Sequence, residues 1–375
     1  MANVDIWLII GTRRWARLMA AELCAILPVD TIIQMLGDPA DLGLQRWLLD
    51  SGLGKNIRVS EVFQPCPPKA TGVALVINSA YMHKSTVEDA FAAGYNVICE
   101  KPISFSKQET LDLISLAETL GLQLFCTNTY LFASYLDRFR EGWLSGYQFT
   151  SMQISWSDPV REIRYGEIKG YDSSVPLIYD ILPHIANIVL ATVGEFSPDS
   201  NSIEVKHGGS QVLIRYLHRN LDIRIDIARN ANQRKRTLTF SGEGPDLVLD
   251  FSIEPGSVFF DQQTSAPLEL SWLHKPKPIF LMLCSVREFF EFGKFDARLS
   301  SSASLFGIEL IDSVIDSYVA QQLDLIHAQD LGSLPDREYA YKEARSIASR
   351  VLPYISESSP LRILASGINL PKRLI

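Results

Sequence analysis

Short apolar runs alternate with amphipathic stretches along the N-terminal third of the chain. Four runs end at glycine or at polar residues, as buried parallel strands do. They are residues 5–10, 31–36, 72–77 and 95–99. After the first run, apolar residues recur at steps of three and four from Ala16 to Leu27, and Pro28 ends the pattern. This period predicts an amphipathic helix.

Two further helices are predicted from signals at their N-termini. Ser85 precedes Glu88 by three residues, which is the spacing of a capping box, in which a hydroxyl and a carboxylate bind unpaired backbone N–H groups. Ser106 precedes Glu109 by the same step. Strands that alternate with helices build a parallel sheet with helices on both faces. We therefore expect a Rossmann-type, doubly wound α/β domain over residues 1–127.

From residue 128 onward the pattern changes to short alternating segments. Alternation of apolar and polar residues is typical of an antiparallel sheet with one covered face. The expected strands are 149–156, 203–205, 212–216, 221–227, 238–240 and 247–251, and the expected helices are 177–193, 278–292 and 308–319. Pro183 predicts a kink or a late start in the first of these helices. Residues 128–375 should form an α+β domain with a mostly antiparallel, open sheet.

Composition and charge narrow the class of protein. Apolar residues make up 47% and charged residues 21% of the 375 residues, as in an ordinary soluble protein, and the length suggests two domains. A formal net charge of −8 argues against nucleic acid or an anionic membrane as the main partner. Five cysteines without CxxC spacing favour reduced thiols. No clustered Cys/His spacing indicates a metal site.

Targeting signals are also not expected. No run approaches the ~20 apolar residues of a membrane helix. The segment from Met1 to Arg14 lacks a basic region and has too short an apolar core for a signal peptide. We therefore expect a cytoplasmic protein.

A degenerate glycine-rich loop follows the first predicted strand. Dinucleotide-binding loops carry glycine at the first, third and sixth positions, and here only Gly11 is glycine, with Arg13 third and Ala16 sixth. The helix N-terminus still offers N–H groups to a phosphate, and Arg13 or Arg14 could add charge-assisted contacts. Asp38, after the second strand, could accept from a ribose 2′-hydroxyl but would repel a 2′-phosphate. The choice between NAD and NADP stays open, with a slight preference for NADP.

Two further clusters carry candidate chemistry. Lys101, in Glu100-Lys101-Pro102, follows the strand 95–99, at the sheet edge where open α/β folds bind ligands, and an X-Pro bond there can be cis. Asp180 and His184 are four residues apart and share one face of an apolar helix, where an acid and an imidazole are costly unless they pair or function. The basic cluster 229–236 is interpreted as a solvated turn.

Taken together, these segments resemble the glucose–fructose oxidoreductase / inositol dehydrogenase / rhizopine-catabolism (Gfo/Idh/MocA) family. Residues 76–83 are similar to its "IATP…H" loop, and residues 92–102 to its "EAGKHVLCEKP" segment. Residues 125–132 are similar to its "GFNxRF" strand, with Tyr130 where arginine is common. The resemblance implies an NAD(P)-dependent oxidoreductase with a Rossmann-type domain and a second, sheet-containing domain.

The family's roles can be carried to matching positions. Lys101 would hold the reacting oxygen beside the nicotinamide, His184 would be the general acid/base, and Asp180 would orient it or bind substrate. A positioned imidazole with a pKa near ~6.5 suits proton transfer at neutral pH. His83 is expected to fix a loop near the nicotinamide rather than to move protons. The coenzyme-binding residues implied are Gly11, Thr12, Arg13, Arg14, Trp15, Asp38, Asn78, Ser79, Ala80, His83, Glu100, Lys101, Pro102 and Asn128.

The expected reaction is hydride transfer to or from a carbonyl, hydroxyl or imine carbon of a small polar substrate, such as a sugar, nucleotide sugar, cyclitol or an intermediate of secondary metabolism. Two alternatives stay open. One is a catalytically silent family member that senses a ligand, which the degenerate loop favours. The other is an NAD-assisted glycosidase, in which the coenzyme stays bound and is not consumed. A homo-oligomer, either a dimer or a tetramer, is expected from the resemblance.

Overall fold

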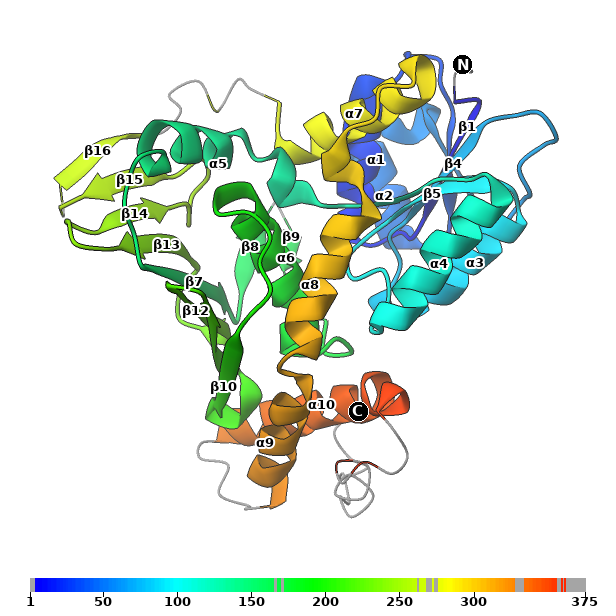
Figure 1. Ribbon diagram of the computed structural model, residues 1–375. Helices are drawn as coiled ribbons and strands as arrows, with labels where there is room; N and C mark the ends of the chain where they lie inside the picture. Colours follow the sequence, from blue (N-terminus) through cyan, green and yellow to red (C-terminus); the bar gives the residue numbers. More distant parts are fainter. Residues whose placement is uncertain are drawn as a thin grey trace. The chain divides into compact units, whose positions relative to one another are not determined.

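The computed structural model describes residues 4–164, 167–169, 172–261, 263–267, 272, 276–327, 334–355, 359 and 361. The chain forms two compact units (Figure 1). The first unit comprises residues Met1–Phe132 and Pro276–Phe306, and the second comprises Ala133–Lys275 and Gly307–Ile375. Within the described residues, no helix is both long enough and apolar enough to cross a membrane.

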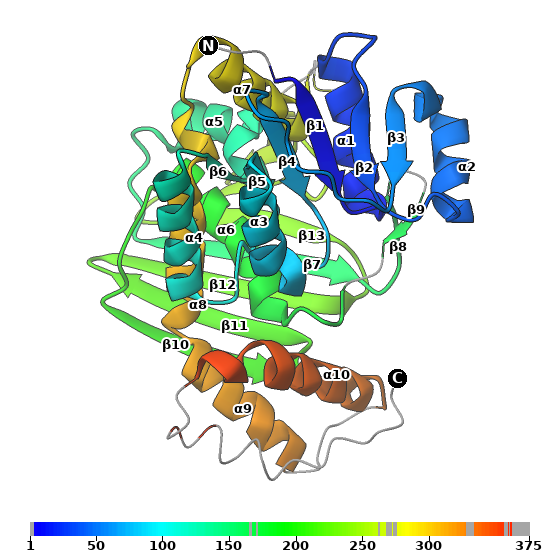
Figure 2. The same cartoon turned by 90° about the vertical axis from the view of Figure 1, so that its right-hand side faces the viewer.

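A parallel sheet of six strands forms the centre of the first unit, in the order β3-β2-β1-β4-β5-β6 (Figure 2). Its strands are β1 (Ile6–Ile10), β2 (Ile33–Leu36), β3 (Ile57–Ser60), β4 (Gly72–Val76), β5 (Tyr95–Cys99) and β6 (Leu124–Cys126). The helices are α1 (Arg14–Ile26), α2 (Leu42–Ser51), α3 (His83–Ala92), α4 (Lys107–Leu120) and α7 (Pro278–Phe292). The predicted Rossmann-type, doubly wound sheet is confirmed.

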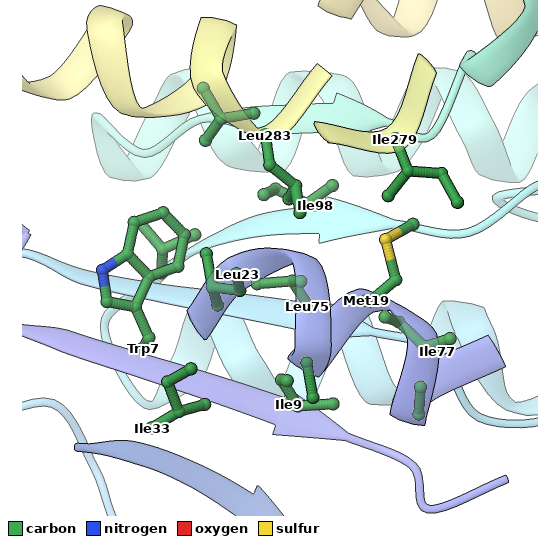
Figure 3. Packing of buried hydrophobic residues seen from close by; sticks show 14 of the residues in the cluster. Trp7, Ile9, Met19, Leu23, Ile33, Leu75, Ile77, Ile98, Ile279 and Leu283 are labelled. Atoms are coloured by element: carbon green, nitrogen blue, oxygen red, sulfur yellow. The ribbon is translucent and has the colours of Figure 1, made fainter. Parts of the chain in front are cut away.

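Each face of this sheet has its own apolar core. Every second side chain along β1 and β4, such as Ile9 and Leu75, packs with Met19 and Leu23 of α1 (Figure 3). Side chains at the intervening positions of β1 and β4, such as Leu8 and Ala74, point to the other face and pack with α3 and α4. Because successive strand side chains point to opposite faces, runs of continuous apolar residues are what a sheet covered on both faces requires.

Helix α7 belongs to the first unit, although it is separated from it in sequence. The sequence analysis placed it in a domain spanning 128–375. In the structure, Ile279 and Leu283 of α7 pack against the same core as Met19 and Leu23 of α1 (Figure 3). The first unit therefore extends beyond residue 127 and also includes Pro276–Phe306. The apolar face of α7 would be exposed without the α1 side of the sheet.

The second unit contains an eight-stranded sheet, in the order β10-β11-β12-β7-β13-β14-β15-β16. Its strands are β7 (Ser151–Pro159), β10 (Ser200–Lys206), β11 (Gln211–His218), β12 (Leu221–Ala231), β13 (Lys235–Ser241), β14 (Leu247–Asp250), β15 (Ser257–Phe260) and β16 (Gln263–Pro267). All neighbours are antiparallel except β12 and β7, which are parallel. The predicted mostly antiparallel sheet is confirmed. A separate hairpin joins β8 (Glu162–Arg164) and β9 (Glu167–Lys169).

Helices of the second unit are α5 (Ser134–Phe139), α6 (Leu177–Thr192), α9 (Ile315–His327) and α10 (Leu334–Arg350), and the unit boundary falls inside α8 (Ser301–Asp312). The single helix predicted at 308–319 is wrong, because the chain turns between α8 and α9. The kink or late start predicted at Pro183 is also wrong, since α6 begins at Leu177 and continues through the proline. Its neighbours are buried, and packing of this kind outweighs one lost backbone hydrogen bond.

The two predicted capping boxes have different outcomes. Ser106 caps α4 as expected, since its Oγ accepts from Glu109 N at 3.4 Å. The Glu109 carboxylate instead accepts a hydrogen bond from Ser104. Ser85 is not a cap, because α3 already begins at His83 and the Ser85 hydroxyl donates to Met82 O at 3.1 Å. A short helical turn at Ala80–Met82 leads directly into α3, so the helix begins earlier in the sequence than a cap at Ser85 would allow.

Candidate functional site

Gly11 connects β1 to α1 and shows that the degenerate loop keeps one strict requirement for glycine. Its φ is +136°, and a Cβ added there would lie 2.6 Å from Ile77 O. A side chain is therefore excluded by both backbone conformation and space. This is the close approach of the β1 and β4 loops that a dinucleotide-binding fold needs at its first glycine.

The N-terminus of α1 has no side-chain cap, as is also true of α3, α5, α6 and α7. Arg13 occupies the N-cap position in an extended conformation and makes no side-chain capping hydrogen bond. The helix hydrogen bonds begin with Arg17 N donating to Arg13 O at 3.0 Å. By contrast, α2 and α4 are capped by Asp41 and Ser106. The first-turn amides of α1 and its dipole thus suit a phosphate.

Residues around the end of β2 define the other side of this loop. The side chain of Thr12 packs against Gly37, so that a Cβ on Gly37 would collide with the threonine methyl group. Arg17 Nε donates to Thr12 O at 2.9 Å and fixes the loop from α1. Asp38 is exposed and its Oδ1 accepts from Ala40 N at 2.7 Å. Arg13 is also exposed, so both candidate determinants of coenzyme preference are accessible.

The loop after β4 is tied to the loop after β5 by His83. Its ring is 1% exposed. Its Nδ1 lies 2.7 Å from Pro102 O, and its Nε2 lies 3.3 Å from Asn78 O. Burial lowers the pKa of His83, outweighing the three backbone contacts that raise it (Pro102, Asn78 and Glu100), and Lys101 lowers it further. His83 therefore holds the two loops together in its neutral form.

Replacing His83 by asparagine should remove a pH dependence of stability. The folded-state pKa of His83 lies below its unfolded value, so stability is full above about pH 6.5 and falls as the pH is lowered from there. Asparagine keeps a donor near Pro102 O but does not titrate. Urea unfolding at about pH 7.5 and 5.5 should show a loss for the wild type that is smaller in the variant, by up to ~1.4 kcal/mol per pH unit. An equal loss in both proteins would contradict this. The exposed His327→Asn change is the control.

Asn78 carries an unused acceptor at the same edge. Its Nδ2 donates to Thr86 Oγ1 at 2.8 Å. Its Oδ1 is buried and has no hydrogen-bond partner within the described residues. Ser79 and Ala80 follow it and lead into the short turn before α3. An orphaned acceptor beside the Gly11 loop is consistent with a bound polar ligand.

Glu100, Lys101 and Pro102 follow β5 directly. Glu100 N donates to Val76 O at 2.9 Å, and the Glu100 carboxylate accepts from the Thr127 hydroxyl. The Lys101–Pro102 bond is cis, which the sequence analysis allowed. Lys101 is partly exposed at the carboxyl end of the strand. The lysine is thus placed at the sheet edge expected for ligand binding.

Asn128 has a structural partner on the returning segment. Its side chain is 1% exposed, and Nδ2 donates to Arg298 O at 3.2 Å and to Ser300 O at 3.0 Å. The amide thus holds residues 298–300 against the end of β6. Trp15, in the first turn of α1, has a buried indole N–H with no hydrogen-bond partner within the described part of the chain. Arg14 is partly buried beside it.

In the second unit, Asp180 and His184 lie on the partly exposed side of α6. Most of this helix is buried, including every residue between them. The Asp180 side chain keeps 35% exposure, and His184 is also partly exposed. The pair therefore faces accessible space from a helix that packing holds rigidly. This is the arrangement expected of side chains that contact a ligand.

Two buried arginines from the sheet support this pair. Arg229 of β12 is 1% exposed, and its Nη2 lies 2.8 Å from Asp180 Oδ2. His184 stacks on Trp156 of β7, with ring centroids 5.5 Å apart and planes 15° apart. The Arg236 guanidinium of β13 lies 3.5 Å from the centroid of the same indole. Arg236 also pairs with Asp158 at 2.5 Å.

The interpretation of 229–236 as a solvated turn is therefore wrong for both of these arginines. Their acidic partners, Asp180 and Asp158, are remote in sequence, so local composition could not reveal them. A signal did exist. Arg229 follows Ile223, Ile225 and Ile227 at steps of two residues, so it points to the same buried face of β12. Arg236 precedes Leu238 and Phe240 at the same step and points to the buried face of β13. A charge at an inward position of a strand needs a buried partner.

No group of three or more His, Cys, Asp or Glu side chains that could hold a metal ion occurs among the described residues. The thiols of Cys99 and Cys126 are buried at adjacent ends of β5 and β6. Burial raises the pKa of both, and that of Cys126 reaches about 12. These two thiols are therefore protonated core residues.

Comparison with known proteins finds one family match, within the first unit. Residues 60–128 match the family model GFO_IDH_MocA, described as an oxidoreductase family with an NAD-binding Rossmann fold. No curated protein matches the chain. The matched segment contains β4, the His83 loop and Glu100-Lys101-Pro102, which are the segments that carried the sequence resemblance.

Solved structures share the fold across most of the chain. A levoglucosan dehydrogenase in complex with NADH and L-sorbose has a TM-score of 0.64 at 14% identity, covering 86% of this chain and 98% of that one. A 3-ketoreductase from Actinomadura kijaniata, in complex with NADP and TDP-benzene, has a TM-score of 0.64 at 15% identity, covering 83% and 97%. A UDP-N-acetylglucosamine 3-dehydrogenase from Acidithiobacillus ferrooxidans has a TM-score of 0.58 at 12% identity, covering 84% and 98%.

At these identities the structural likeness establishes the fold alone. Residues 60–128 match the model of the Gfo/Idh/MocA oxidoreductase family with its NAD-binding Rossmann fold, which is the family that the sequence resembles.

Proposed function

We propose that this protein is an NAD(P)-dependent oxidoreductase that transfers hydride to or from a hydroxyl, carbonyl or imine carbon of a small, sugar-like substrate. The observation that carries the proposal is the Asp180–His184 pair, which stays accessible on an otherwise buried helix and is backed by two buried arginines. Buried charges that hold an accessible acid and imidazole in place are costly unless the pair functions.

The coenzyme would be held by the first unit. Gly11, the uncapped N-terminus of α1 and the orphaned Asn78 oxygen fit a dinucleotide. When bound, the nicotinamide supplies or accepts the hydride. A proton must also be moved and a developing negative charge on oxygen stabilised, and both tasks fall to the protein.

We assign the proton to His184 and the oxygen to Lys101. An imidazole can take up or release a proton near neutral pH, and stacking on Trp156 holds its ring in one plane. Lys101 supplies a fixed positive charge for an alkoxide-like oxygen. Asp180, paired with Arg229, is suited to accept a hydrogen bond from a substrate hydroxyl. The L-sorbose bound to the levoglucosan dehydrogenase and the UDP-N-acetylglucosamine in the name of the 3-dehydrogenase support a polyol substrate.

Fluorescence titration with NADPH and NADH tests the coenzyme. We expect NADPH to bind about tenfold or more tightly than NADH, because an arginine at a 2′-phosphate makes a charge-assisted hydrogen bond of ~1.5–3 kcal/mol. Arg13→Gly should reduce this preference by a similar factor. Arg219→Gly, at an exposed turn of the second unit with positive φ, is the matched control and should change nothing.

The other outcomes of this titration are equally informative. Tighter binding of NADH, unaffected by Arg13→Gly, would assign Asp38 to the ribose of NAD. Saturable binding with no turnover would favour a ligand sensor. A coenzyme that copurifies and is never consumed would favour the glycosidase alternative. Failure to bind either nucleotide would overturn the proposed function.

A further inference from the structure

Arg229 places a buried positive charge next to the carboxylate of Asp180. Its side chain is 1% exposed, and Nη2 donates to Asp180 Oδ2 at 2.8 Å. Nη1 and Nη2 both donate to Val175 O at 3.2 Å, just before α6 begins. The guanidinium is therefore held in a fixed plane by the backbone, with one edge directed at the carboxylate.

A second carboxylate balances this charge from the other side. Glu343 of α10 is 2% exposed, and its Oε2 lies 3.9 Å from Arg229 Nη1. Its Oε1 accepts from Leu177 N, the first residue of α6, at 2.7 Å and also from the Tyr318 hydroxyl. Glu343 thus binds both the arginine and the start of the helix that carries Asp180.

The groups around Arg229 keep its guanidinium positively charged. Burial by itself lowers the pKa of a guanidinium, but the surrounding groups raise the pKa of Arg229 well above its ordinary value. These groups are Tyr339, Asp180 and Glu343. Arg229 faces Asp180 from β12, while His184 lies one turn further along α6. The accessible carboxylate of the pair thus has a permanent buried counter-ion.

We propose that Arg229 is a positioning residue that keeps Asp180 ionised and in one orientation, so that Asp180 accepts a hydrogen bond from a substrate hydroxyl and His184 alone moves the proton. The ionisation of Asp180 follows from contacts within the second unit, whereas the role toward substrate rests on the proposed function. An opposite charge at this distance favours the ionised form of a carboxyl group.

Carbon-13 NMR of protein labelled at the aspartate carboxyl carbons tests the ionisation directly. The signal of Asp180 is identified by its loss in Asp180→Asn. In the wild type its titration midpoint should lie below the ordinary value of about 3.9. A wild-type midpoint at or above that value would overturn the proposal without any variant of Arg229.

A charge-balanced double variant then separates positioning from folding. Arg229→Met alone leaves Glu343 as an uncompensated buried carboxylate, so it is combined with Glu343→Gln. In the double variant the Asp180 midpoint should rise by about 1–3 pH units. An unchanged midpoint in the folded double variant would show that Arg229 has only a structural role. Arg215→Met, which removes an exposed arginine paired with Asp222, is the control and should leave the midpoint of Asp180 unchanged.

Kinetics connect the result to substrate. In the double variant, KM for a polyol substrate should rise about tenfold or more and the acidic limb of kcat/KM should move to higher pH. Coenzyme affinity should stay unchanged, since its predicted ligands belong to the first unit. If the wild type binds no coenzyme, the proposed function fails while the NMR titration still decides the role of Arg229. Unchanged KM and pH profile with a raised Asp180 midpoint would refute the substrate role.

Discussion

Replacement of His184 by asparagine should lower kcat by roughly 10²–10⁴-fold, the usual contribution of a positioned acid or base. Asparagine keeps polarity on α6 but cannot exchange a proton near neutral pH. In the proposed mechanism the partly exposed imidazole, held against Trp156, is the proton-exchanging group of the Asp180 pair. The measurement is the absorbance of the reduced nicotinamide during turnover, with sugars, nucleotide sugars and cyclitols screened first on the wild type.

Chemical rescue separates lost proton transfer from lost packing. Added imidazole should restore part of the rate of His184→Asn if the side chain moves a proton. A purely structural role would give no rescue. His327→Asn, at an exposed position of α9, is the matched control and should keep the wild-type rate. Wild-type turnover by His184→Asn would remove His184 from the proposed chemistry.

Gly11→Val should weaken coenzyme binding by roughly 100-fold or more. A Cβ at this position would lie 2.6 Å from Ile77 O, and the backbone has a φ of +136°. The strain of about 1–3 kcal/mol for such a backbone conformation, together with the clash, must displace the loop after β1. A loss of ~2.7 kcal/mol in binding already corresponds to a factor of about 100.

The matched control for this change is Gly54→Ala. Gly54 has ordinary φ, and an added Cβ would lie 3.9 Å from Leu48 O, which is a normal contact. Binding by Gly54→Ala should equal that of the wild type. Circular dichroism of both variants checks that the fold persists. Tight binding of coenzyme by folded Gly11→Val would mean that the β1–α1 loop does not hold the nucleotide.

The sequence was a good guide wherever a local pattern decided the structure. The parallel sheet follows from apolar runs such as 72–77, which must be covered on both faces. The Asp180–His184 spacing placed both side chains on one helical face. Predictions that depended on a single residue did less well. Pro183 does not interrupt α6, because burial of the flanking residues outweighs its missing N–H.

Contacts between distant segments account for what sequence could not provide. Arg229 meets Asp180 across a separation of 49 residues, and Arg236 meets Asp158 across 78. Neither pairing leaves a trace in local composition, so the arginines resembled a solvated turn. The return of α7 has the same origin. Its amphipathic pattern predicted a helix correctly, but the surface that it covers is made by α1 and the sheet.

This return has a consequence for how the protein folds as it is synthesised. The core between α1 and the sheet includes Ile279, Met282 and Leu283 of α7. A ribosome that has just made Phe132 must still make residues 133–275, which takes roughly 7–30 s at about 5–20 residues per second. During that interval the apolar surface awaiting α7 is exposed in the nascent chain. The first unit therefore cannot finish folding before Pro276–Phe306 has been made, and chaperone protection matters most in this interval.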